Sequence, residues 1–129
     1  MDFVGYFKTN SILPPETFRQ RLEAYCQSNG HRLLACIDEP TLSFGFKTVF
    51  GRLKSGSVGL ICLDWSDLLH GDLFQQCMLI TSFIGPQRQR LIIANENIDN
   101  ATDEGLAALV EVWTKLDESF RLKYESGKS

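Results

Sequence analysis

The most constraining feature of this sequence is a long amphipathic pattern near its carboxyl end. Apolar residues recur there at three- and four-residue steps, the spacing that places side chains on one face of a helix. They are Leu106, Leu109, Val110, Trp113, Leu116, Phe120 and Tyr124. Thr102 precedes them and can accept a hydrogen bond from a free N–H group of the first turn. Asp103 and Glu104 follow at the positive end of the helix dipole. The pattern predicts a helix at about 102–125.

Such a helix is long for a chain of 129 residues. From Asp103 to Tyr124 it would measure about 33 Å at roughly 1.5 Å per residue. A weaker apolar stripe, formed by Ala108, Val112 and Leu122, lies on the opposite side of the same helix. We therefore expect one face to dock on its own domain and the other on a second copy.

The preceding part of the chain alternates apolar runs with amphipathic segments. Strands are expected at 3–7, 32–37, 58–63 and 91–94, with helices at 15–29, around 49–53 and from Ser66 or Asp67 to 84. Segment 38–46 reads as a loop. The run 58–63 is apolar without alternation, which is typical of a strand covered on both faces. This order predicts an α/β fold of three layers, with a mostly parallel sheet and helices on both faces. One domain is expected to span 1–129.

Composition argues against several classes of function. The net charge is -3, and the 13 lysines and arginines form no basic stripe of the kind that nucleic-acid binders carry. No signal peptide and no apolar run of about 20 residues is present, so we expect a cytoplasmic protein without a membrane span. Cys26, Cys36, Cys62 and Cys77 form no C-x-x-C pair. We interpret them as reduced core residues, and we expect no metal and no cofactor.

In a parallel sheet the functional crevice lies beyond the carboxyl ends of the strands. Lys8, Asn10 and Ser11 follow the first expected strand. A second set follows the third strand: Asp64, Trp65, Asp67 and His70. Neither set contains the glycine pattern that cradles phosphates, so a nucleotide site is not expected.

Four segments in the right order resemble the serine recombinases, the family of resolvases and invertases. They are residues 5–10 (GYFKTN), 22–30 (LEAYCQSNG), 63–69 (LDWSDLL) and 96–105 (ENIDNATDEG). The last closely matches the loop that leads into the long dimer helix of that family. The resemblance covers about 3–124 and implies a resolvase-like fold. It also implies that a DNA-binding region, which that family places after the long helix, is missing here.

The residues that carry the family's chemistry differ. The family pattern Tyr-x-Arg-x-Ser supplies a serine that attacks a DNA phosphate, whereas this chain has Lys8 and Asn10 at the matching positions. The arginines of the Leu-Asp-Arg-Leu-x-Arg segment are absent, and Trp65 follows Asp64 instead. Segment 38–46, where a further arginine would stand, has none. Ser11 stands one residue after the position of the family's serine, and its hydroxyl would lack a group that activates it.

Transesterification concentrates negative charge that guanidinium groups neutralise. Losing one such donor typically costs roughly 3 kcal/mol in barrier height. We therefore expect a pseudoenzyme with no catalytic residue, whose degenerate positions are Lys8, Asn10, Ser11, Asp64 and Trp65. Trp65 either covers the vacated cleft or anchors a partner. Asp64 reads as a residue that caps or orients the following turn.

The expected role is self-association and protein–protein contact, structural or regulatory, as a homodimer or a higher homo-oligomer. The expected interface residues are Leu109, Trp113, Leu116, Phe120 and Tyr124. An unidentified protein partner fits this role, and specific nucleic-acid binding does not. Two alternatives stay open: a recombinase accessory or resolvase-type enzyme, and a hydrolase that uses Ser11, His70 and Asp64.

Overall fold

The structure, a computed structural model, describes residues 2–8, 14–39, 58–69, 73–86 and 88–126, and the statements that follow concern these residues. Its strands are β1 (Asp2–Lys8), β2 (Arg32–Glu39), β3 (Gly59–Cys62), β4 (Leu91–Ile93) and β5 (Ile98–Asp99). Its helices are α1 (Pro15–Ser28), α3 (Trp65–Leu68), α4 (Leu73–Thr81), the 3₁₀ turn η1 (Ala94–Glu96) and α5 (Asp103–Ser126).

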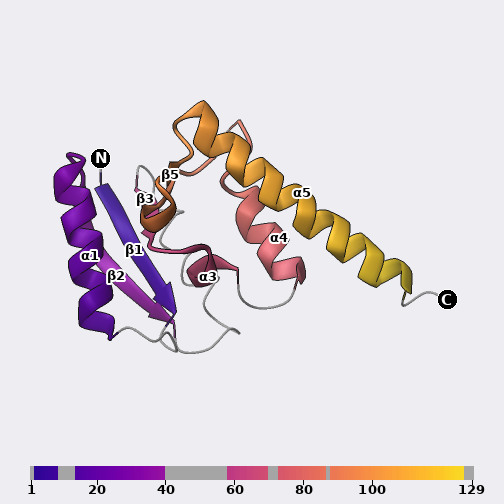
Figure 1. Cartoon of the computed structure of the whole chain (residues 1–129), viewed down its shortest axis with the longest axis horizontal. Helices are drawn as coiled ribbons and strands as arrows, with labels where there is room; N and C mark the ends of the chain where they lie inside the picture. The colour runs from indigo at the N-terminus through magenta and orange to yellow at the C-terminus, as the bar shows by residue number, and fades with distance from the viewer. Residues whose placement is uncertain (1, 9–13, 40–57, 70–72, 87, 127–129) are drawn as a thin grey trace.

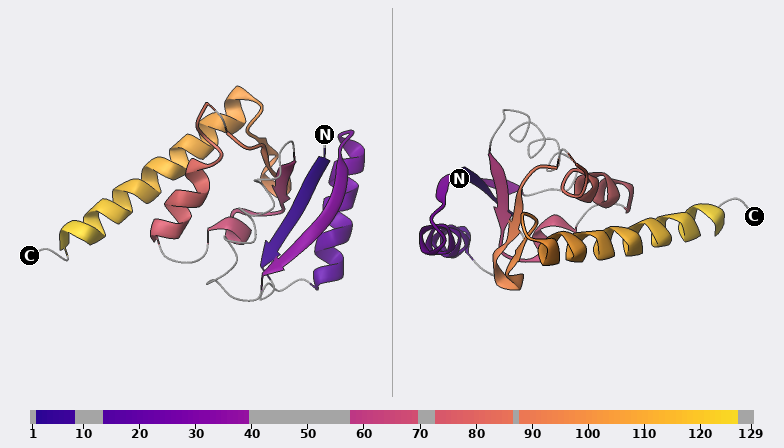
Figure 2. Two further views of the ribbon diagram at one scale, coloured as in Figure 1. Left: turned by 180° about the vertical axis from the view of Figure 1, so that it is seen from behind. Right: turned by 90° about the horizontal axis from the view of Figure 1, so that it is seen from above.

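The five strands form one sheet in the order β2-β1-β3-β4-β5. β1 is parallel to β2 and β3, and β3 is parallel to β4, whereas β5 runs antiparallel to β4. Helix α1 covers one face, and α4 and α5 lie on the other (Figures 1 and 2). The predicted mostly parallel α/β sheet with helices on both faces is thereby confirmed, and each expected strand lies within two residues of its observed bounds.

Two apolar clusters fill the space on either side of the sheet. Phe3 and Phe7 of β1 pack toward α1, and Val4 and Tyr6 of the same strand pack toward the opposite face. Because alternate side chains of a strand point to opposite faces, a strand covered on both sides must be apolar throughout. The continuous run at 58–63 has the same cause, since β3 is buried along its length.

Helix α5 confirms the predicted long helix. The Gly105 N–H donates to Thr102 Oγ1 at 3.0 Å, so Thr102 caps the first turn as expected. Leu109 is fully buried in the cluster that also contains Leu79 and Phe83. The last turns of α5 extend past α4 (Figures 1 and 2).

The expectation of one helix from Ser66 or Asp67 to 84 was wrong. Two helices occupy this region, α3 and α4, and residues 70–72 lie outside the described part. The cap is Asp64 rather than Ser66 or Asp67. Asp67 stands three residues later, and its Oδ2 accepts a hydrogen bond from the Asp64 N–H at 3.2 Å. Helical periodicity continues across the break, so apolar spacing alone could not reveal it.

β5 was not predicted. It has only two residues, too few to show an alternating pattern, and it follows Asn97, which adopts the left-handed conformation with φ 53°. The loop expected at 38–46 was wrong at its start, because β2 continues to Glu39. The rest of that loop and the helix expected around 49–53 lie outside the described residues.

Candidate functional site

The carboxyl ends of β1, β3 and β4 meet at one edge of the sheet because these strands are parallel. This edge is where the sequence placed the candidate crevice. The backbone of Lys8 ends β1 there, while the Lys8 side chain, Asn10, Ser11 and His70 are outside what the structure describes. Asp64, Trp65 and Asp67 are described, and all three lie at this edge.

Asp64 is bonded to a residue that the sequence did not single out. The Asn95 side-chain amide donates to Asp64 Oδ1 at 3.0 Å, and the Asn95 backbone N–H donates to the Leu63 carbonyl at 2.9 Å. Asn95 thus ties the end of β4 to the end of β3. Its position one residue beyond the fourth expected strand was the available signal, because parallel strands end at the same edge. Together with the cap of α3, this bond makes Asp64 an orienting residue, as expected.

Two ionisable groups lie beneath this edge. The Asp67 side chain is 2% exposed and accepts from the Asp64 N–H. Cys62 donates its Sγ–H to the Asp64 carbonyl at 3.6 Å. Burial raises the pKa of the Cys62 thiol well above its ordinary value, and the carboxylates of Asp67 and Asp64 raise it further. The thiol therefore stays protonated at neutral pH and is unsuited to act as a nucleophile.

Trp65 is half-buried and packs against the cluster formed by α4, α5 and their face of the sheet. The expectation that Trp65 either covers a vacated cleft or anchors a partner stays a prediction. The family pattern has arginines in this segment. None of the described residues Asp64, Trp65, Asp67 and Asn95 carries a guanidinium group or any other positive charge. Among the described residues, no group of three or more His, Cys, Asp or Glu side chains is arranged to hold a metal ion.

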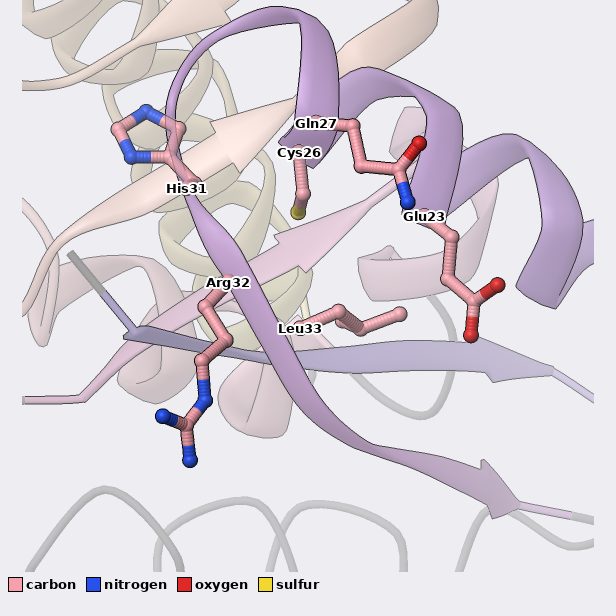
Figure 3. A pocket seen from close by; sticks show the side chains of 6 residues that line it. All are labelled: Glu23, Cys26, Gln27, His31, Arg32 and Leu33. Carbon is pink, nitrogen blue, oxygen red and sulfur yellow. The ribbon is translucent and has the colours of Figure 1, made fainter.

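A groove of about 320 Å³ lies elsewhere, between the end of α1 and the start of β2. Six residues line it: Glu23, Cys26, Gln27, His31, Arg32 and Leu33. Arg32 points to one side of β2 while Leu33, Gln27 and Glu23 lie on the other (Figure 3). Burial raises the pKa of the Cys26 thiol, and the electrostatic effects of Cys36 and Glu23 raise it further. These side chains do not converge, so the groove is not a candidate active site.

The cysteines agree with the expectation of free thiols, although not all four are core residues. Cys26 and Cys62 are buried, and Cys36 and Cys77 are partly exposed. No described helix is both long and apolar enough to pass through a bilayer.

The residues expected at a subunit interface divide into two groups. Leu109 belongs to the core, and the Trp113 indole N–H donates to Thr81 Oγ1 of α4 at 3.1 Å. Leu116 and Phe120 are half-buried, while Tyr124 is 58% exposed. Leu109 and Trp113 therefore hold α5 to its own domain. The residues of the distal half, from Leu116 to Tyr124, reach the surface.

An exposed apolar strip continues from distal α5 onto α4. The Phe120 ring lies 6.3 Å from the Phe74 ring and 6.4 Å from the Tyr124 ring, measured between centroids. Phe74 is 57% exposed, and Met78, four residues later on α4, is 51% exposed. We call Phe74, Met78, Phe120 and Tyr124 the α4–α5 strip. The sequence did not single out Phe74 and Met78, although their spacing of four residues outside the predicted core stripe was a signal.

The opposite side of α5 offers no comparable surface. Of Ala108, Val112 and Leu122, only Leu122 is exposed, and Glu118 precedes it by one helical turn. The weaker apolar stripe is therefore not a continuous exposed face.

No family model and no curated protein matches the sequence. Among solved structures, the N-terminal catalytic domain of TP901-1 integrase, a serine recombinase domain, is similar, with a TM-score of 0.74. The match covers 94% of this chain and 97% of that chain at 13% sequence identity. At such low identity the likeness concerns the fold, and the arrangement of sheet and long helix agrees with it. This chain therefore has the fold of a serine-recombinase catalytic domain.

Proposed function

We propose that this protein is a catalytically inactive serine-recombinase-like domain that acts by self-association and protein contacts. The observation that carries the proposal is the α4–α5 strip, in which the exposed rings of Phe74 and Tyr124 flank the half-buried Phe120. Exposed aromatic side chains that adjoin one another are characteristic of interaction surfaces.

The inactivity rests on residue identity. Asn10 stands at the nucleophile position, and a carboxamide cannot form a phosphodiester with DNA. Lys8 replaces an arginine, and a single ammonium group does not reproduce bidentate neutralisation of a phosphoryl transition state. Trp65 adds no charge at its position. Each missing donor costs roughly 3 kcal/mol, so the combined loss exceeds what Ser11 could recover.

A second copy of the chain is the occupant that best suits the strip. A two-fold axis would bring the strip of one copy onto that of the other, and an apolar surface is complementary to itself in this arrangement. None of Phe74, Met78, Phe120 and Tyr124 carries a charge that would meet its own copy across such an axis. An unidentified protein partner would use the same chemistry.

The competing functions make different demands. A DNA-acting recombinase or accessory protein needs cationic contacts to phosphates, and the chain has a net charge of -3. A hydrolase would need Ser11, His70 and Asp64 to act together. Asp64 is already bonded to Asn95 and caps α3, which leaves it poorly suited to orient a histidine.

Incubation with supercoiled plasmid tests the inactivity. We expect no nicked product and no covalent protein–DNA conjugate. A conjugate that forms with the wild type and is lost in Ser11→Ala would refute the proposal. A conjugate that persists in Ser11→Ala would also refute the proposal, and it would mean that a residue other than Ser11 is the nucleophile.

A further inference from the structure

A cluster of one aromatic ring and two basic side chains lies at the amino ends of the strands, far from the edge where their carboxyl ends meet. The Phe3 ring makes an edge contact with the His31 ring, with centroids 4.8 Å apart and planes at 64°. The Arg90 guanidinium carbon lies 5.6 Å from the centroid of the same Phe3 ring. Phe3 thus contacts a permanent cation and a residue that becomes a cation in mild acid.

Arg90 also forms a two-pronged ion pair. Its Nε donates to Asp99 Oδ1 at 3.0 Å, and its Nη2 donates to Asp99 Oδ2 at 2.5 Å. The two side chains are only 25% and 22% exposed. Paired guanidinium–carboxylate bonds of this kind are stronger and more directional than single ones.

Asp99 in turn holds the base of α5. Its Oδ1 accepts from the Ala101 N–H at 3.0 Å, and its carbonyl accepts from both the N–H and the hydroxyl of Thr102 at 3.0 and 2.8 Å. The Gly105 backbone packs against the Asp99 backbone so closely that a Cβ would overlap it. A displacement of Asp99 would therefore disturb the first turn of α5.

His31 is placed where a proton is poorly accommodated. Its Nδ1 is buried and has no hydrogen-bond partner among the described residues. Burial lowers the pKa of His31, the charges of Arg90 and the chain's amino terminus lower it further, and Asp99 raises it. Tyr25 of α1, whose pKa burial and Asp99 raise, belongs to the same electrostatic group and is neutral at physiological pH.

We propose that protonation of His31 loosens the base of α5. The added charge would repel Arg90 across the Phe3 ring and compete for Asp99, the carboxylate that positions Ala101 and Thr102. This attachment of α5 to the sheet is a proton-sensitive clasp, defined by Phe3, His31, Arg90 and Asp99. It concerns how α5 is held and does not depend on self-association.

The sign of the pH effect follows from the lowered pKa. Between the folded value and the ordinary value of about 6.5, the unfolded chain binds more protons at His31 than the folded chain does. Stability therefore falls as the pH drops below about 6.5, by at most about tenfold in the unfolding constant per pH unit for one proton. The lowered pKa of Asp99 acts in a more acidic range, because carboxylates titrate near pH 4.

The first experiment measures urea unfolding at pH 7.5, 6.5 and 5.5, conditions chosen around that ordinary value of about 6.5. The chain has two histidines, His31 and His70, which provides a matched control. We expect the wild type and His70→Gln to lose stability in this range, and His31→Gln to lose none. Should His31→Gln fail to fold, His31→Phe serves the same purpose. Equal pH dependence in the wild type and the His31 variant would overturn the proposal.

The second experiment asks whether the loss is local to the base of α5. Hydrogen exchange, compared at each pH with His31→Gln, should show reduced protection at the amides of Ala101, Gly105 and Leu106 in the wild type at pH 5.5. Amides in the middle of α1 should lose no more protection than the fall in global stability accounts for, because they lie outside the clasp. A uniform loss of protection would mean that His31 affects global stability alone, and the clasp would be rejected.

Discussion

The backbone of Gly105, in the first turn of α5, packs directly on the backbone of Asp99, the last residue of β5. A Cβ at position 105 would overlap the Asp99 carbonyl, and it would also press on the Asp99 carbonyl carbon and nitrogen. Because the obstacle is backbone rather than the end of a flexible side chain, the helix itself would have to move.

Gly105→Ala should therefore destabilise the fold by about 2–3 kcal/mol, the usual cost of overpacking, even though alanine is the better helix former. Gly85→Ala is the matched control, because nothing lies within 4 Å of an added Cβ there. Urea denaturation followed by circular dichroism compares the two. Equal stability of the two variants would show that the contact tolerates displacement.

Asn100 provides the second prediction. This residue is 1% exposed, and its Oδ1 accepts from the Leu91 N–H at 2.9 Å. Its Nδ2 donates to the Phe83 and Gln89 carbonyls at 3.0 and 2.7 Å. Asn100→Ala would leave two buried backbone groups and one partly buried group without this partner, and each buried group costs about 1–3 kcal/mol when left unpaired.

We expect Asn100→Ala to lower the free energy of unfolding by about 3 kcal/mol or more. Asn95→Ala is the control, since Asn95 is exposed and its side-chain bond is to Asp64. Asn95→Ala should lower the free energy of unfolding by only about 1 kcal/mol. A comparable effect of the two substitutions in thermal and urea unfolding would contradict the role assigned to Asn100.

The strands and the long helix could be predicted because their signals are local. The apolar runs of β1, β3 and β4 are buried on both faces, and the spacing from Leu109 to Phe120 follows the helical period that the structure shows. The polar residues that join these elements gave no such signal. Asn95, Asn100 and Arg90 act on partners between nine and thirty-one positions away, and only the pairing of strands brings them together.

The interface prediction shows the same limit. Leu109, Trp113, Leu116, Phe120 and Tyr124 share one helical face, so periodicity could not separate those that pack on α4 from those that reach solvent. The division depends on where α4 ends beside α5. Phe74 and Met78 fall outside the predicted core stripe of this region, but only the packing of α4 beside α5 brings the Phe74 ring next to the Phe120 ring.

The third prediction concerns DNA affinity. With a net charge of -3 and no clustered arginines, the protein should bind duplex DNA weakly at about 150 mM salt, since phosphate contacts supply most non-specific affinity. Fluorescence anisotropy with a labelled duplex measures this, and a salt series shows how many phosphates are contacted. Saturable sub-micromolar binding that persists at this salt concentration would favour a DNA-bound accessory role.

The last prediction concerns self-association through the α4–α5 strip. Tyr124 and Leu122 are two residues apart on α5 and similarly exposed, at 58% and 61%. Because residues at this spacing point about 200° apart, Tyr124 lies in the strip and Leu122 on the other side. The same substitution at each position therefore changes charge equally but touches different surfaces.

We expect the wild type to be a dimer at tens of micromolar in analytical ultracentrifugation. Tyr124→Asp should weaken the dimer at least about tenfold, which corresponds to 1.4 kcal/mol, because two like charges would meet near the two-fold axis in an apolar seam. Leu122→Asp should leave the dimer intact, and circular dichroism should show both variants folded. A monomeric wild type would remove the basis for self-association. Dissociation by Leu122→Asp but not by Tyr124→Asp would place the interface on the outer side of α5, where the exposed surface is mostly charged.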